Sequence, residues 1–146
     1  NKIISKFGTS TVSCKLDVKL SGLLRKRFKV DGQDLKIALS KLERFEFNEL
    51  IFIDIDRDGS RGGYNNDLIE NIVESKQFYS GDMNIGYGGG INDWNSIKGI
   101  LQKGFSSVYS GTHFSTTKSN NGVLINYPNE QQLNQIKWKT YPALDV

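Results

Sequence analysis

The sequence predicts an α/β fold: a parallel (βα)4 arrangement that forms half of an eightfold β/α (TIM) barrel. Apolar strand patterns alternate with amphipathic helical patterns at a spacing of roughly 25–30 residues, which is typical of βα units in a parallel sheet. A polar or glycine-rich cluster follows each predicted strand, where barrels carry their ligand sites. A four-stranded open sheet is the structural alternative. A half-barrel alone would leave two strand edges open, which proteins normally avoid.

The 146 residues suit one domain or part of a larger one. Hydrophobic content of 37% and charged content of 24% indicate a globular chain. The net charge of +3 is small and scattered, and the short basic cluster at residues 25–27 reads as a solvated hairpin, so no nucleic-acid partner is expected. No run of about 20 apolar residues and no signal peptide is visible. We therefore expect a cytoplasmic protein without a membrane segment.

The first part of the chain predicts a helix end, a strand, a ribbon and a helix. Ile3, Ile4 and Phe7 have helical spacing before a glycine, which suggests that the chain is a piece of something longer. Residues 10–19 alternate as a strand in which Cys14, the one cysteine, is packed. Next come a short ribbon around Phe28 and Val30, and a helix that starts at Leu35 with Asp34 as its cap.

The rest of the chain predicts three more strands, each followed by a helix. Residues 50–55 form a strand that is apolar on both faces at first, as buried parallel strands are. The expected elements that follow are a helix at 66–75, a strand at 83–87, a helix capped by Asn92 or Asp93 and stopped by Gly104, a strand at 105–110, and a final unit with V-L-I-N-Y-P (123–128) and a polar helix at 130–136.

Three aspartates mark the end of the strand at 50–55. Asp54 and Asp56 alternate and could share a face, whereas Asp58 lies in the following loop, where it could act as a general acid or base. The alternative for Asp58 is an ordinary turn residue before glycine. A calcium loop is disfavoured because the twelfth position counted from Asp54 is Asn65 and not glutamate. No metal site is therefore expected.

Two glycine-containing segments follow the last two strands. The run Gly88-Gly89-Gly90 precedes a capped helix, and Gly111-Thr112 offers further N–H groups and a hydroxyl. Paired loops of this kind match the recurrent phosphate site of barrel enzymes, although tight turns are the simpler alternative. The single histidine, His113, has no partner for a zinc site or a catalytic triad.

Several motifs together resemble a known family. The segments F-G-T-S-T-V-S-C-K-L-D-V-K, E-L-I-F-I-D-I, D-R-D-G-S, I-G-Y-G-G-G and V-Y-S-G-T resemble the C-terminal half of the cyclase subunit of imidazole glycerol phosphate synthase, over about residues 3 to 115. The resemblance implies a barrel lyase of histidine biosynthesis. It would take ammonia from a glutaminase (amidotransferase) subunit and convert a phosphorylated ribulosyl formimino intermediate to imidazole glycerol phosphate and aminoimidazole carboxamide ribotide. No cofactor is expected.

The resemblance also implies roles for single residues. Asp58 would be one of two catalytic aspartates, the other belonging to a first strand that this chain does not contain, and Asp17 a supporting carboxylate on the fifth barrel strand. Glu49 would lie where ammonia enters; read alone, it is a surface charge before a strand. The residues that match a substrate phosphate site are Gly88, Gly89, Gly111 and Thr112. The 146 residues would then be one domain, a half-barrel that lacks its N-terminal half and is inactive alone.

The sequence departs from this family at three positions. Ile53 and Asp54 stand where the family usually has small hydroxyl residues, and the family usually has a small residue near Tyr87. The extra carboxylate and the bulky phenol at the rim are expected to alter substrate fit. The stretch G-V-L-I-N-Y-P-N-E resembles instead a paralogous branch that works with an amidotransferase to build acetamidino groups on surface sugars. A third hypothesis is a non-catalytic half-barrel that binds phosphorylated ligands.

Overall fold

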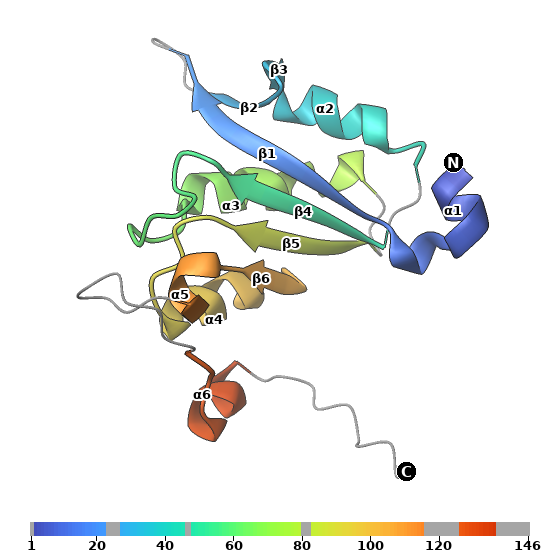
Figure 1. Cartoon of the computed structure of the whole chain (residues 1–146). Coiled ribbons are helices and arrows are strands. Elements are labelled where there is room, and N and C mark those ends of the chain that lie inside the picture. Colours follow the sequence, from blue (N-terminus) through green and yellow to red (C-terminus); the bar gives the residue numbers. More distant parts are fainter. Residues whose placement is uncertain (1, 23–26, 46–47, 80–82, 116–125, 137–146) are drawn as a thin grey trace, which may run out of the picture.

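The computed structural model describes residues 2–22, 27–45, 48–79, 83–115 and 126–136 (Figure 1). These residues form a six-stranded sheet in the order β3-β2-β1-β4-β5-β6. Four strands are parallel: β1 (Ser13–Ser21), β4 (Glu49–Asp54), β5 (Asn84–Gly88) and β6 (Ser107–Tyr109). A ribbon of β2 (Arg27–Val30) and β3 (Gln33–Asp34) extends the sheet in antiparallel fashion. The predicted parallel (βα)4 half-barrel is therefore confirmed, with an added ribbon at its edge.

The helices alternate with the parallel strands. They are α1 (Lys2–Phe7), α2 (Leu35–Leu42), α3 (Asn66–Glu74), α4 (Trp94–Gln102), α5 (Gly111–Ser115) and α6 (Glu130–Gln135), with 3-10 turns η1 (Thr9–Thr11) and η2 (Ser75–Phe78). Side chains of Asp34, Asn65 and Asp93 accept hydrogen bonds from the first turns of α2, α3 and α4, which explains where these helices begin. No helix among the described residues is long and apolar enough to cross a membrane.

The two faces of the sheet differ. Along β4, Leu50 and Phe52 are buried whereas Ile51 and Ile53 are half-exposed, because successive side chains of a strand point to opposite faces. The buried face packs against α2, α3 and α4 in one hydrophobic core, which includes Leu16, Val18, Leu39, Leu50, Phe52, Leu68, Ile69, Ile72, Ile85 and Ile100. No helix crosses the near face of β1, β4 and β5 in Figure 1, and we call this the open face.

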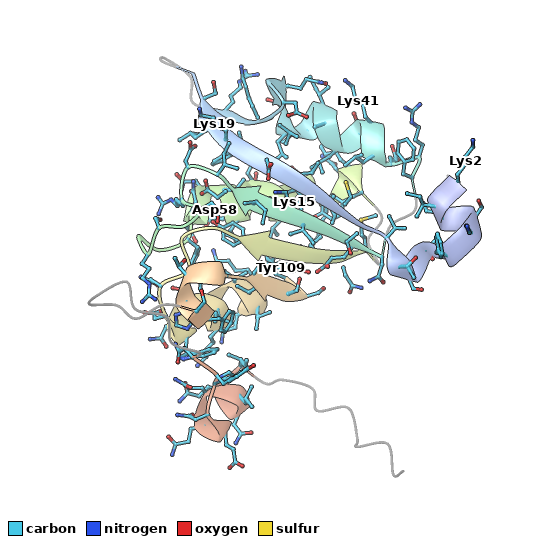
Figure 2. All side chains as sticks on the ribbon, in the orientation of Figure 1. Lys2, Lys15, Lys19, Lys41, Asp58 and Tyr109 are labelled. Carbon is cyan, nitrogen blue, oxygen red and sulfur yellow. The ribbon has the colours of Figure 1, made fainter. Side chains whose placement is uncertain are left out.

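The open face is organised in rows that run across the parallel strands. The strand register places Asp17, Ile53, Gly88 and Tyr109 in one row near the carboxyl ends, and Lys15, Ile51, Gly86 and Ser107 in the next. Lys15, Lys19 and Tyr109 project from this face (Figure 2). Layers of inward-pointing side chains are what a β/α barrel places in its interior. The open face is thus the half-barrel's inner surface.

Element boundaries differ locally from the sequence prediction. The first strand begins at Ser13 and not at residue 10, because residues 9–11 form the turn η1. The last parallel strand ends at Tyr109, since α5 begins at Gly111. The predicted V-L-I-N-Y-P unit and the basic cluster fall partly outside the described residues, at 123–125 and 25–26. Arg27, the described member of that cluster, lies 3.7 Å from the Asp34 carboxylate.

Candidate functional site

The loops after β4 and β5 and the start of α5, which follows β6, meet at the carboxyl ends of these strands. Arg61, in the loop after β4, donates a hydrogen bond of 2.7 Å from Nη2 to the carbonyl oxygen of Thr112, after β6. The same loop touches the loop after β5, because a Cβ atom added to Gly90 would lie 2.2 Å from the carbonyl oxygen of Gly63. The loop that carries Asp58 therefore contacts both the glycine run after β5 and the segment Gly111-Thr112 after β6.

Asp58 is exposed in the loop after β4, at the end of the sheet where the strands stop (Figure 2). Its Oδ1 accepts a hydrogen bond of 2.9 Å from the N–H of Gly59. Asp58 therefore acts as a turn residue before glycine, as the D-G pair suggested, and its carboxylate is still accessible from solvent. A local hydrogen bond of this kind also restricts the carboxylate's orientation.

Asp17 lies on the open face of β1, one row below the loops. Its carboxylate is exposed and forms an ion pair of 2.9 Å with Lys15. The register pairs Asp17 with Ile53, which is paired in turn with Gly88. No interaction described for this chain joins Asp17 to Asp58; what they share is an end of the sheet.

The glycines after β5 allow close approach of backbone segments. A Cβ atom at Gly88 would lie 2.7 Å from Cδ1 of Ile53, and one at Gly89 would lie 2.6 Å from the carbonyl oxygen of Asp54. Gly89 and Gly90 also have φ angles of 109° and 74°, which favour glycine. By contrast, a Cβ at Gly111 would meet no atom within 4 Å. As far as the described residues go, space is open beside Gly111, while the run at 88–90 is packed.

Arg61 is a residue that the sequence interpretation left without a role. It brings a half-buried guanidinium to the loops predicted to bind phosphate. Arginine is well suited to phosphate because its planar group offers several donors. The sequence gives little indication of this role for Arg61, because the carbonyl group that it binds belongs to Thr112, 51 residues further along the chain.

Two of the three departures from the family pattern do not face the open side. Asp54 is 2% exposed and Tyr87 is 0% exposed, and both side chains lie on the helix-covered face. The expectation that these two residues alter substrate fit by direct contact at the rim is therefore wrong; only Ile53 is on the open face. The reason is strand alternation, which aligns Asp54 with Leu50 and Phe52.

The predicted shared face for Asp54 and Asp56 is also wrong. The strand ends at Asp54, and Asp56 is exposed in the turn beyond it, where its Oδ2 accepts a 2.8 Å hydrogen bond from the N–H of Leu20. Burial raises the pKa of the Asp54 carboxyl, opposed by the Asn65 side chain, the Asp56 N–H and the Arg57 charge. Alternation ceases to apply once the chain leaves the sheet.

Glu49 lies at the opposite, amino-terminal end of β4. Its carboxylate accepts hydrogen bonds from the hydroxyls of Ser107 and Tyr109, the latter of 2.6 Å. These side chains lie directly over Gly86. A Cβ atom at Gly86 would lie 2.6 Å from the Ser107 hydroxyl oxygen, so glycine leaves the room that the cluster occupies. Glu49 is thus part of a polar cluster on the open face and not an isolated surface charge.

The histidine and the cysteine of the chain lie apart from these loops' carboxylates, and both are at least partly buried. Among the described residues, no group of three or more His, Cys, Asp and Glu could hold a metal ion. His113 is buried, and its ring centroid lies 4.9 Å from that of Trp94 and 5.4 Å from that of Phe114. Burial raises the pKa of the Cys14 thiol, which makes it a poor nucleophile.

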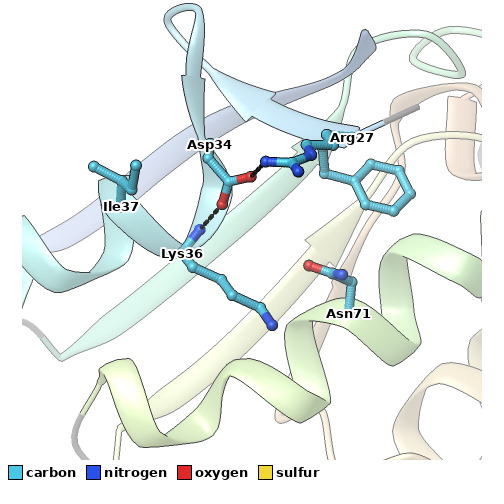
Figure 3. Close-up of a pocket in the computed structure, with 6 residues that line it drawn as sticks. Arg27, Asp34, Lys36, Ile37 and Asn71 are labelled. Carbon is cyan, nitrogen blue, oxygen red and sulfur yellow. Dashed lines mark hydrogen bonds and ion pairs between the residues drawn. The ribbon is translucent and has the colours of Figure 1, made fainter. Parts of the chain in front are cut away.

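A separate groove of about 520 Å³ lies between the ribbon, α2 and α3 (Figure 3). Arg27 and Asp34 line it and partly neutralise each other, and Asp34 also accepts a 3.1 Å hydrogen bond from the Lys36 N–H. It is formed away from the loops described above, by residues of β2, β3, α2 and α3.

Parallel βα units, layered open-face residues and loops converging at the carboxyl ends define half of an eightfold β/α barrel. The chain belongs to the histidine biosynthesis protein family, whose sequence pattern matches residues 1–120. It is 28% identical over 134 residues to a Leptospira borgpetersenii protein described as "Putative imidazole glycerol phosphate synthase subunit HisF", covering 86% of this chain and 50% of that protein. The chain thus spans about half the length of this curated relative.

Proposed function

We propose that this chain is the carboxyl-terminal half of an ammonia-dependent barrel lyase of the imidazole glycerol phosphate synthase cyclase type. In the complete protein it would convert the phosphorylated ribulosyl formimino intermediate to imidazole glycerol phosphate and aminoimidazole carboxamide ribotide. The family match and the half-length similarity to a HisF subunit support this proposal. The observation that carries it is the contact among the three loops, through Arg61 and Thr112 and through Gly63 and Gly90.

The proposed roles follow from position. Asp58, exposed at the mouth, acts as general acid or base towards the reacting atoms. Asp17, one row lower on the open face, supports it by holding an intermediate. The backbone around Gly88, Gly89, Gly111 and Thr112 holds a substrate phosphate. Binding energy from such a remote phosphate positions the reacting centre.

The proposed ammonia path begins at the other end of the sheet. Glu49 lies at the start of β4, and its two hydroxyl partners fix its carboxylate on the open face. A glutaminase subunit at this end would deliver ammonia along the inner surface towards Asp58. The partner and the path belong to the proposal and rest on the family's known architecture.

The test is an assay of the complete protein with an ammonium salt and the ribulosyl intermediate, following formation of imidazole glycerol phosphate. Asp58→Asn should lower turnover by about 10²–10⁴-fold while substrate binding persists, because a general acid–base group is lost and no bulk is added. Asp67→Asn, an exposed acid in the first turn of α3, is the matched control. Turnover of Asp58→Asn close to that of the control would remove Asp58 from the mechanism.

The paralogous sugar-modifying reaction is the second candidate, favoured by the G-V-L-I-N-Y-P-N-E stretch. The same assay with a nucleotide-activated sugar acceptor in place of the ribulosyl compound separates the two. Binding of phosphorylated ligands without turnover of either substrate would indicate the non-catalytic half-barrel instead.

A further inference from the structure

The loop that carries Asp58 is fastened from beneath by four polar side chains. We propose that Asp54, Arg57, Asn65 and Tyr87, of which Asp54 and Tyr87 are buried, form a clamp that fixes this loop, and with it the Asp58 carboxylate, before any ligand binds. They are positioning residues in this assignment, and its catalytic meaning rests on the function proposed above.

Arg57 closes the loop on itself. Its Nη1 donates to the carbonyl oxygen of Gly63 at 2.9 Å and lies 3.5 Å from that of Tyr64. The residue directly before Asp58 is therefore tied to the far end of the loop. The turn is tightened further because the N–H and hydroxyl of Ser60 both donate to the Arg57 carbonyl oxygen.

Asp54 anchors Arg57 to the sheet. It is the last residue of β4, and its Oδ2 lies 3.7 Å from Nε of Arg57. Its Oδ1 accepts a 3.2 Å hydrogen bond from the N–H of Asp56. Within the described part of the chain, Oδ2 has no hydrogen-bond donor. A buried carboxylate is costly without a partner charge, and Arg57 at 3.7 Å supplies one that offsets part of the effect of burial.

Tyr87 holds the other end of the loop. Its hydroxyl, supplied from the last residue but one of β5, accepts a 3.1 Å hydrogen bond from the N–H of Asn65. The Asn65 side chain in turn accepts from the N–H of Leu68 and starts α3. Both ends of the loop are thereby attached to neighbouring parallel strands.

The clamp matters for chemistry because general acid–base transfer depends on the position of the carboxylate. A misplacement of about 1 Å can cost on the order of 10²-fold in rate. Asp58 lies outside the sheet, and its turn hydrogen bond with the Gly59 N–H orients its carboxylate locally. Its position is therefore set by the ends of the loop, which the clamp controls.

Amide hydrogen exchange in the complete protein tests the clamp without any substrate. Tyr87→Phe removes one hydroxyl and should speed exchange at Asn65 and across residues 57–64 by about 5- to 10-fold, the effect of one lost hydrogen bond. Tyr79→Phe is the matched control, because its buried hydroxyl also bonds a backbone group, the Ile72 carbonyl, away from this loop. Equal exchange of the loop in both variants, or uniformly faster exchange throughout Tyr87→Phe, overturns the proposal.

Turnover provides the second measurement. In the complete protein, Tyr87→Phe and Arg57→Lys should lower kcat and leave KM for the phosphorylated substrate nearly unchanged, whereas Tyr79→Phe should change neither. A raised KM with normal kcat would place the clamp in ligand binding and refute its positioning role. If the unmodified protein turns over none of the substrates tested, the proposed function fails, and the exchange result alone still decides whether the clamp fixes the loop.

Discussion

The contact between the loops after β4 and β5 can be tested by adding one methyl group. Gly90 and Gly59 have similar positive φ angles, 74° and 70°. A Cβ atom at Gly90 would lie 2.2 Å from the Gly63 carbonyl oxygen, whereas one at Gly59 would meet nothing within 4 Å. Substitution by alanine therefore imposes a similar backbone cost at both positions, and a steric clash only at Gly90.

The expected magnitudes follow from this difference. Gly59→Ala should lower the free energy of unfolding by about 1–2 kcal/mol, the cost of a left-handed alanine. Gly90→Ala should add about 1–3 kcal/mol or more for overpacking against backbone that cannot rotate away. Urea unfolding of the complete protein measures both, with an unchanged m value showing that the comparison is valid. Equal losses in the two variants would mean that these loops do not touch, and the convergence that carries the proposed function would lose half of its support.

Three further predictions concern charge and ionisation. Arg61→Gln should weaken binding of a phosphate monoester by about 10- to 100-fold, measured by calorimetry, because a charge-assisted hydrogen bond is lost. The control is Arg44→Gln, since the Arg44 guanidinium lies over the Phe45 ring. Equal affinities of the two variants would exclude Arg61 from the site. Glu49→Gln should lower glutamine-driven turnover more than ammonium-driven turnover if Glu49 lies on the ammonia path, and parallel losses would contradict that role. Burial raises the pKa of both Tyr79 and Tyr87 from 10.0 to about 12. Since the folded pKa exceeds the unfolded one, stability should be full below pH 10 and fall as pH rises towards 12, by about 2–3 kcal/mol for each tyrosine. Tyrosinate absorbance followed during alkaline unfolding checks this, and a transition without loss of stability in that range would refute it.

Much of the fold is readable from local sequence. The alternation in residues 13–21 and the apolar run at 50–53 are strand signals. Asp34, Asn65 and Asp93 are helix caps whose hydrogen bonds reach only two or three residues along the chain. The order of these elements then predicts the parallel sheet. Its carboxyl edge, and with it the end of the sheet where Asp58 lies, follows from that topology.

The composition of the site is less readable, since its contacts are non-local. Arg61 reaches Thr112 across 51 residues and Tyr109 reaches Glu49 across 60, and no periodicity signals either pair. The sequence also left open which face of the sheet Asp54 lies on. A strand that is apolar on both faces does not indicate which face the helices cover. That face became visible only once α3 and α4 were placed against the sheet.

The sequence by itself therefore determined the βα order, the helix starts and the end of the sheet that carries the polar loops, because each depends on hydrogen bonds and periodicities a few residues long. Only the tertiary structure decided that Asp54 and Tyr87 lie buried beneath the Asp58 loop, that Arg61 joins the glycine-bearing loops, and that Glu49 is held by two hydroxyls. Those outcomes depend on which strands are neighbours and how closely their backbones approach, and glycines at 86, 88, 89 and 90 permit approaches that any side chain would prevent.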